Sequence, residues 1–114
     1  MLIRVCKLSD LEDKKPKKFS LKGDYEVVLI KIGNNVFAIE AYCPHKGGNM
    51  EYGDIILRDT EYVIKCHLHG YEYNLKNGKL IFNPYGDRKG RWYYSPDLRI
   101  FEVKIIDDEI YIEV

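Results

Sequence analysis

The sequence predicts an all-β domain, built as a small barrel or sandwich of stacked antiparallel sheets. Short segments rich in β-branched and aromatic residues follow one another along the chain. Gly, Asn and Asp turn signals separate these segments, and helix signals are scarce. Short strands at such close spacing are typical of small all-β folds. The length of 114 residues suits one domain, which we expect to span residues 1–114.

The first part of the chain is predicted to contain one strand and one short turn. Cys6 falls in the strand and is interpreted as a small buried hydrophobe. Ser9-Asp10-Leu11-Glu12 follows and has the residues to cap a single helical turn. The charge run from Lys14 to Lys18, which Pro16 interrupts, is interpreted as a solvated loop.

Three pairs of strand-like segments flank short turns and are predicted to form hairpins. The pairs are Tyr25 to Ile32 with Val36 to Ala41, Tyr71 to Leu75 with Lys79 to Phe82, and Arg99 to Ile106 with Glu109 to Val114. The intervening turns are Gly33-Asn34-Asn35, Lys76-Asn77-Gly78 and Asp107-Asp108. One further strand is predicted from Tyr62 to Cys66.

The composition is that of an ordinary globular protein, with 46% hydrophobic and 32% charged residues. The 18 basic residues balance the 18 acidic ones, so net charge provides no attraction to nucleic acid or to an anionic membrane. No apolar run approaches the ~20 residues of a membrane-spanning helix. Met1 to Lys15 lacks the apolar stretch of a signal peptide, and we therefore expect a cytoplasmic protein.

Two segments at predicted strand ends carry the residues with the clearest chemistry. Cys43-Pro44-His45 precedes Gly47 and Gly48, and Cys66-His67-Leu68-His69 precedes Gly70. Three cysteines in a reducing compartment do not suggest a disulfide framework. Each segment instead offers one thiolate and one imidazole, and such mixed sets suit zinc or an iron–sulfur centre.

The spacing of these ligands favours iron–sulfur and leaves zinc as the alternative. Zinc sites commonly combine two cysteines at close spacing with two distant, closely spaced histidines. Here each segment contributes one cysteine and one histidine, in the orders C-x-H and C-x-x-H. In that pattern the two cysteines hold one iron and the two histidines hold the other.

The two segments resemble the cluster-binding boxes of the Rieske family. The first reads CPHKGGNMEYG, with Gly47 and Gly53 at the family's glycine positions. The second reads CHLHGYEY and is followed by the turn Asn77-Gly78. The closing segment RIFEVKIIDDEIYIEV also resembles the last hairpin of Rieske ferredoxins. The resemblance covers about residues 25–82 and 98–114.

The resemblance implies a cluster-binding subdomain at about residues 42–83 and one [2Fe–2S] cluster per chain. The implied ligands are Cys43, His45, Cys66 and His69. It further implies that the two cysteines lie deep and that the two histidines are partly exposed. The implied function is that of a one-electron carrier between a reductase and an oxygenase or another redox partner.

Several positions depart from the Rieske proteins of quinol-oxidising complexes. Gly48 and Leu68 occupy the positions of the loop cysteines that form a disulfide in those proteins, and Tyr71 replaces a serine. The match is therefore better to soluble Rieske ferredoxins. Asn83 to Pro96 is longer than the corresponding ferredoxin loop. Its basic and aromatic residues suggest a loop that covers the cluster or docks a partner, with single-stranded nucleic acid as the less favoured ligand.

No feature of the sequence suggests that the chain is itself an enzyme. It contains no Gly-rich nucleotide motif, so its electrons are expected from a separate reductase. The alternatives are a small subunit of a nitrite reductase-like enzyme and a structural zinc-binding domain. Two residues beside the ligands stay open to interpretation: His67 is expected at the surface, and Tyr73 either donates a hydrogen bond to a ligand sulfur or only packs.

Overall fold

The computed structural model describes residues 1–114 and contains eleven strands and three single 3₁₀ turns. The strands are β1 (Leu2–Lys7), β2 (Lys17–Leu21), β3 (Tyr25–Ile32), β4 (Asn35–Glu40), β5 (Asp54–Arg58), β6 (Glu61–Lys65), β7 (Glu72–Asn74), β8 (Leu80–Phe82), β9 (Ile100–Phe101), β10 (Val103–Ile106) and β11 (Glu109–Glu113). The 3₁₀ turns are Leu8–Asp10, Met50–Tyr52 and Arg91–Tyr93. No helical segment is long and apolar enough to cross a membrane.

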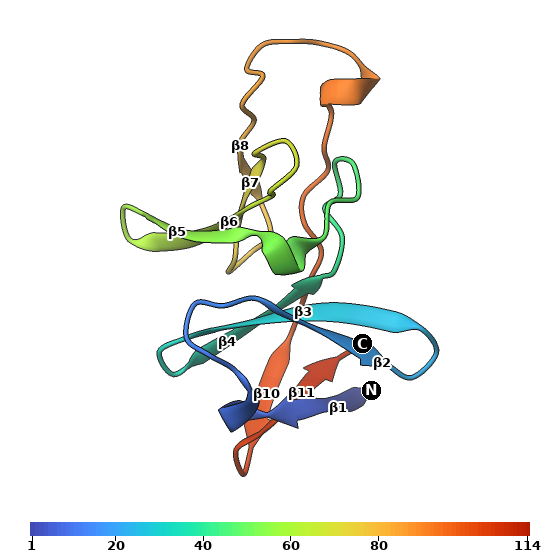
Figure 1. Ribbon diagram of the computed structural model, residues 1–114, viewed down its shortest axis with the longest axis vertical. Helices are drawn as coiled ribbons and strands as arrows, with labels where there is room; N and C mark the ends of the chain where they lie inside the picture. Colours follow the sequence, from blue (N-terminus) through green and yellow to red (C-terminus); the bar gives the residue numbers. More distant parts are fainter.

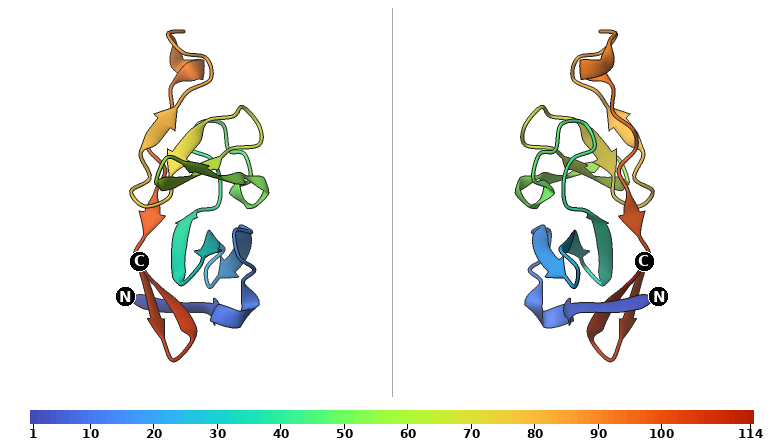
Figure 2. Two further views of the ribbon diagram at one scale, coloured as in Figure 1. Left: turned by 90° about the vertical axis from the view of Figure 1, so that its left-hand side faces the viewer. Right: turned by 90° about the vertical axis from the view of Figure 1, so that its right-hand side faces the viewer.

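The strands form three antiparallel sheets that stack along the long axis of a 47 × 34 × 20 Å molecule (Figures 1 and 2). The base sheet has the order β1-β11-β10, and both chain termini lie beside it. The middle sheet has the order β2-β3-β4-β9, and the upper sheet has the order β5-β6-β7-β8. The prediction of an all-β fold of stacked antiparallel sheets is confirmed.

Strand β3 explains why the sheets stack, because its side chains supply two separate cores. Successive residues of a strand point to opposite faces of the sheet. Val27 and Leu29 therefore pack toward the base sheet, whereas Val28 and Ile30 pack toward the upper sheet. All four side chains are fully buried. The continuous apolar run of β3 thus places it at the centre of the molecule.

The chain leaves the middle sheet for the upper sheet and returns to the middle sheet at one place. Strand β4 pairs with β9, so that Ile39 lies opposite Ile100. The backbone N–H of Glu40 donates to the carbonyl of Arg99, and the Glu40 carboxylate accepts from the N–H of Arg99. Everything between these two residues rises above the middle sheet (Figure 1). It includes both segments that carry the Cys and His pairs.

The structure corrects three details of the predicted strands. The lysine run is not entirely loop, because β2 begins at Lys17 and places Phe19 against the lower core. Strand β5, with the sequence DIILR, was not among the predicted strands. The strand predicted from Arg99 to Ile106 breaks at Glu102, where the chain passes from the middle sheet to the base sheet.

Candidate metal centre

Two loops with the same hydrogen-bond pattern carry the predicted ligands. In the first loop, the N–H of Cys43 donates to the carbonyl of Gly48, and the N–H of Gly47 donates to the carbonyl of Cys43. In the second loop, the N–H of Cys66 donates to the carbonyl of Tyr71, and the N–H of Gly70 donates to the carbonyl of Cys66. The first loop follows β4 and the second follows β6. We call them the paired loops, residues 43–48 and 66–71.

Glycine is needed in the paired loops for two different reasons. Gly47 and Gly70 have φ values of +76° and +79°, in the left-handed region where other residues are strained. Gly48 has a different constraint, because a Cβ atom there would lie 2.8 Å from the Sγ atom of Cys66. The first loop can therefore approach the second closely only where the side chain is absent.

The two predicted cysteine ligands meet in the interior of the upper core. Cys43 is 4% exposed and Cys66 is 2% exposed. The neighbouring Cys66 thiol lowers the pKa of Cys43, whereas the Cys43 thiol and burial raise the pKa of Cys66. A metal that binds thiolates would displace the protons of both thiols and be held by the two sulfurs.

The two predicted histidine ligands also lie together. Their rings are 5.2 Å apart between centroids and nearly perpendicular. The Nε2 atom of His45 lies 2.5 Å from the carbonyl oxygen of Trp92. A carbonyl oxygen can only accept, so Nε2 of His45 must carry the proton and donate it. Its Nδ1 atom then keeps a free lone pair, the form in which imidazole binds a metal.

The exposure of the histidines differs from the expectation that both are partly exposed. His69 is half-buried, as expected, but His45 is only 7% exposed. The ring of Tyr71 stacks on the ring of His45, with 3.9 Å between the ring centroids. The ring of Trp92 is perpendicular to the ring of His45, with 5.0 Å between the centroids. The expectation for His45 is therefore wrong, because Tyr71 of the second loop and Trp92 of the 83–96 segment cover it. His67 points outward and is exposed, as predicted.

Tyr73 makes the hydrogen bond that the sequence left open. Its Oη atom lies 3.4 Å from the Sγ atom of Cys43 and 2.7 Å from the Oγ atom of Ser95. Ser95 also donates to the carbonyl of Pro96. A thiolate at Cys43 can only accept, so Tyr73 then donates to it while Ser95 turns to donate to Tyr73. Tyr73 is completely buried, and this burial is the main cause of its raised pKa.

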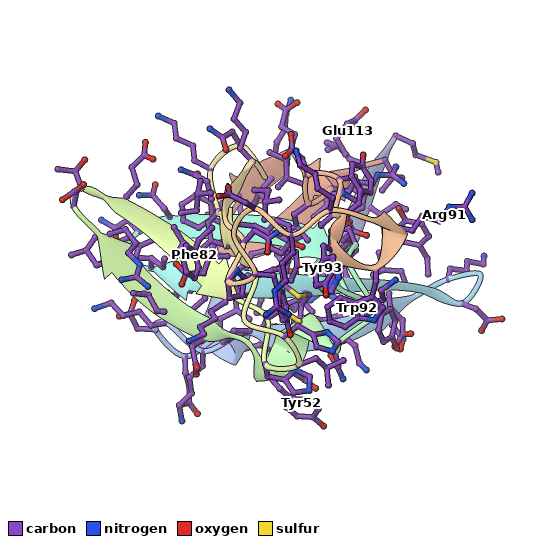
Figure 3. The ribbon with its side chains drawn as sticks, turned by 90° about the horizontal axis from the view of Figure 1, so that it is seen from above. Tyr52, Phe82, Arg91, Trp92, Tyr93 and Glu113 are labelled. Atoms are coloured by element: carbon purple, nitrogen blue, oxygen red, sulfur yellow. The ribbon has the colours of Figure 1, made fainter.

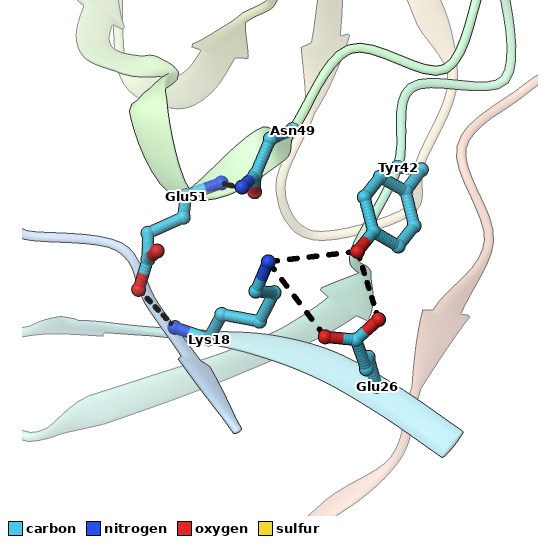
Figure 4. A network of polar contacts seen from close by, with 5 residues as sticks. All are labelled: Lys18, Glu26, Tyr42, Asn49 and Glu51. Atoms are coloured by element: carbon cyan, nitrogen blue, oxygen red, sulfur yellow. Dashed lines mark hydrogen bonds and ion pairs between the residues drawn. The ribbon is translucent and has the colours of Figure 1, made fainter. Parts of the chain in front are cut away.

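A polar network fixes the first paired loop to the middle sheet (Figure 4). The Oη atom of Tyr42, next to Cys43, donates to the carboxylate of Glu26 at 2.8 Å and lies 3.5 Å from the Nζ atom of Lys18. Beyond the loop, Glu51 accepts from the backbone N–H of Lys18 and donates its own N–H to the side chain of Asn49. Both ends of the loop are thereby held on strands β2 and β3.

Sequence analysis placed Trp92 in a basic and aromatic segment expected to cover the cluster or dock a partner, but it did not identify Ser95 as part of this site. No residue preference reveals the second role of Trp92, in which its main-chain carbonyl group accepts from His45. Ser95 lies far along the chain, where a lone serine carries no signal. The signs in the sequence were the unusual length of the segment from Asn83 to Pro96 and its basic and aromatic residues.

The residues present fit a bridged two-iron cluster. No three His, Cys, Asp or Glu side chains converge as the ligands of one metal ion. Two sulfurs lie together in the core, and two imidazoles lie together nearer the surface. The glycine at position 48 keeps the space beside Cys66 free of a side chain. Soft thiolates and borderline imidazoles are suitable ligands for iron in such a cluster.

Comparison with known sequences identifies related proteins of two kinds. The profile of the family described as the Rieske [2Fe-2S] domain matches residues 1–104. The ferredoxin component of the alkene monooxygenase system of Xanthobacter autotrophicus is 28% identical over 82 residues, which cover 72% of this chain and 63% of that protein. Cholesterol 7-desaturase of Caenorhabditis elegans is 26% identical over 83 residues, 73% of this chain. The match spans only 19% of the desaturase.

Solved structures share the fold over nearly the whole chain. The ferredoxin of carbazole 1,9a-dioxygenase from Nocardioides aromaticivorans superposes with a TM-score of 0.79 at 23% identity, covering 98% of this chain and 96% of that one. A structure described as an NADH-dependent nitrite reductase small subunit from Mycobacterium tuberculosis superposes with a TM-score of 0.80 at 14% identity, covering 98% and 93%. At these identities the likeness concerns the fold alone.

Proposed function

Since the chain belongs to the Rieske [2Fe-2S] domain family, whose members bind a [2Fe–2S] cluster, we propose that it carries single electrons between a reductase and an oxygenase or another redox partner. The proposed ligands are the thiolates and imidazoles of the paired loops, namely Cys43, His45, Cys66 and His69. The cytoplasmic location expected from the sequence is part of the same proposal.

The observation that carries this proposal is the matched geometry of the paired loops. Each loop is closed by the same two backbone bonds around a cysteine, so the two thiols are brought together at equivalent positions. The histidines follow two and three residues later and meet at the outer end of the loops. The site thus offers one pair of sulfurs and one pair of ring nitrogens, as a two-iron cluster of this family requires.

When bound, such a cluster supplies one-electron redox chemistry, at a potential that its ligands and their hydrogen bonds tune. The chain contributes the surroundings. Burial of Cys43 and Cys66 keeps water from the sulfurs, and Tyr73 is positioned to donate a hydrogen bond to one of them. The Trp92 carbonyl holds the proton on Nε2 of His45, which would leave Nδ1 free to bind a metal, a support typical of histidine ligands.

The charge around the site favours a partner with an acidic contact surface. The paired loops and the 83–96 segment hold four cations, Lys46, Arg88, Lys89 and Arg91, against one acid, Asp87. Since the whole chain is neutral, these segments carry a net positive charge and the remaining residues carry the balancing negative charge. Such a distribution steers an acidic partner toward the site and loses its effect as salt screens it.

Stopped-flow oxidation of the reduced protein by hexacyanoferrate(III), an anionic reagent, tests this charge effect without the natural partner. The rate should fall as ionic strength rises, and Lys46→Glu should slow it more than Lys104→Glu, which makes the same charge change on the base sheet. Equal effects of the two substitutions would contradict electron exchange at the positive end.

Metal and sulfide analysis of anaerobically purified protein tests the cluster itself. We expect about two iron and two sulfide ions per chain, with two distinct iron environments in Mössbauer spectra. His69→Ala should lose the cluster, whereas the matched control His67→Ala should keep it, because His67 points away from the site. Stoichiometric zinc without iron, or a protein free of metal, would refute the proposal and favour the structural-zinc or subunit alternative.

A further inference from the structure

The segment 83–96, which we call the arm, leaves strand β8 and turns back above the paired loops (Figures 1 and 2). Its 3₁₀ turn, Arg91–Tyr93, directs main-chain carbonyl groups at the site. The carbonyl of Trp92 accepts from His45, and the carbonyl of Tyr93 accepts from the hydroxyl of Tyr71 at 2.8 Å. Asn83, at the start of the arm, donates to the same Tyr93 carbonyl at 3.2 Å.

These contacts of the arm surround the imidazole of His45 and not that of His69. His45 lies between the stacked ring of Tyr71 and the edge of Trp92, and its outer nitrogen is hydrogen-bonded. His69 touches the arm only through the indole of Trp92, at 4.9 Å between centroids. Both inward carbonyls of the arm are already occupied, by His45 and by Tyr71. The ring of His69 therefore stays half-buried at the surface.

We propose that the arm makes the two imidazoles inequivalent, so that His45 is closed off and only His69 is open to a redox partner. The partner would dock on a small apolar surface formed by His69, Leu68 and Trp92. Leu68 is 51% exposed and Trp92 is 41% exposed, although both are large apolar residues. This inference rests on the proposed function, because it assigns different roles to two of the proposed ligands.

The surface fits a partner that combines an apolar contact with an acidic rim. Seen from above, Trp92 lies over the site while Arg91 points away from the body of the protein (Figure 3). Lys46 also lies beside this surface, with its Nζ atom over the indole ring of Trp92, 5.8 Å from the ring centre. An apolar centre with charges around it is the usual anatomy of a protein contact surface. We therefore assign this surface to a redox protein whose own cofactor lies near an acidic patch.

The test uses diethyl pyrocarbonate, which acylates accessible imidazole nitrogens, on the oxidised protein with its cluster. Peptide mass spectrometry then gives the labelling rate of each histidine, and His67 serves as the exposed reference. His45 should react roughly tenfold more slowly than His69, because it reacts only after the arm has opened. Equal rates for His45 and His69 in the unmodified sequence would overturn the inference.

Two variants loosen the arm without removing a ligand. Tyr71→Phe keeps the ring on His45 but loses the bond to Tyr93, and Asn83→Ala removes the second bond to the same carbonyl. Each should raise the labelling rate of His45 about threefold or more and leave that of His67 unchanged. Tyr25→Phe is the matched control, since Tyr25 lies on the middle sheet, and it should change neither rate.

Fluorescence gives a second measurement, because Trp92 is the only tryptophan of the chain. Release of the arm in Tyr71→Phe or Asn83→Ala should increase quenching of Trp92 by acrylamide. If neither variant changes the labelling of His45 or the quenching of Trp92, the arm does not control access and the inference fails. Iron and sulfide are measured on the same samples: a protein without cluster refutes the proposed function, whereas equal labelling with the cluster intact refutes only this inference.

Discussion

Tyr73→Phe is the substitution that isolates a single hydrogen bond to the proposed cluster. It removes one oxygen atom from a completely buried ring whose hydroxyl lies 3.4 Å from the Cys43 sulfur. Ser95 loses a partner too, but its hydroxyl still donates to the carbonyl of Pro96. No buried polar group is therefore left without a bond, and the free energy of unfolding should fall by no more than about 1 kcal/mol.

The expected effect is on the reduction potential. Reduction adds negative charge, which makes the sulfur a better acceptor, so the bond from Tyr73 stabilises the reduced state more. A hydrogen bond to a charged group is worth about 1.5–3 kcal/mol in total. If a third to a half of that differs between the redox states, the difference is about 0.5–1.5 kcal/mol. For one electron this corresponds to a potential lower by roughly 20–65 mV.

Spectroelectrochemical titration of the purified variants measures this shift. Ser95→Ala should lower the potential less than Tyr73→Phe does, because it removes only the donor behind the Tyr73 hydroxyl. Tyr62→Phe is the matched control, since Tyr62 packs against the same core without a hydrogen bond to the site, and it should leave the potential unchanged. An unaltered potential in Tyr73→Phe would show that Tyr73 only packs.

Three further predictions concern the frame around the site. Gly48→Ala should reduce iron per chain and destabilise the fold by roughly 1–3 kcal/mol in urea denaturation, because its Cβ would lie 2.8 Å from the Cys66 sulfur. Burial raises the pKa of Cys6 to about 11. The stability that the protonated thiol contributes is therefore fully present below pH 9 and is lost as pH rises from 9 through 11. The free energy of unfolding should fall by about 2–3 kcal/mol over this range, and Cys6→Val should not show the loss. Arg58→Met should lower the urea midpoint, because it leaves the buried carboxylate of Glu72 without its two-bond partner, and Glu72→Gln in the same background should restore part of the loss.

Local patterns allowed the strands and the paired loops to be predicted. The hairpin of β3 and β4 was evident because β-branched residues and a glycine turn are signals within a few positions. The Cys and His pairs were evident because ligand types and spacing follow from metal chemistry. Each of these features depends on neighbours along the chain.

The features that escaped prediction depend on contacts between distant residues. The burial of His45 is caused by Tyr71 and Trp92, which lie 26 and 47 positions away, and the bond to Trp92 acts through the main chain. The partner of Tyr73, Ser95, is 22 positions away. The same reason explains β2, whose lysines looked solvated until the structure placed Lys18 beside Glu26 at 3.7 Å. The periodicity of the sequence does not indicate which distant residues will pair.

The pairing of Glu40 with Arg99 joins the two ends of the part of the chain that carries the site, so this part is inserted into the two lower sheets at a single junction. These residues are 59 positions apart and yet adjacent in space, so the chain returns to the same point of the middle sheet after it has formed the upper sheet and the arm. Below that junction the base and middle sheets share a core of their own, from Cys6 to Ile112. The entropy of closing such a loop grows only slowly with its length. Insertions and deletions above the junction, such as a longer arm, can therefore change which partner is recognised while the two lower sheets keep their register.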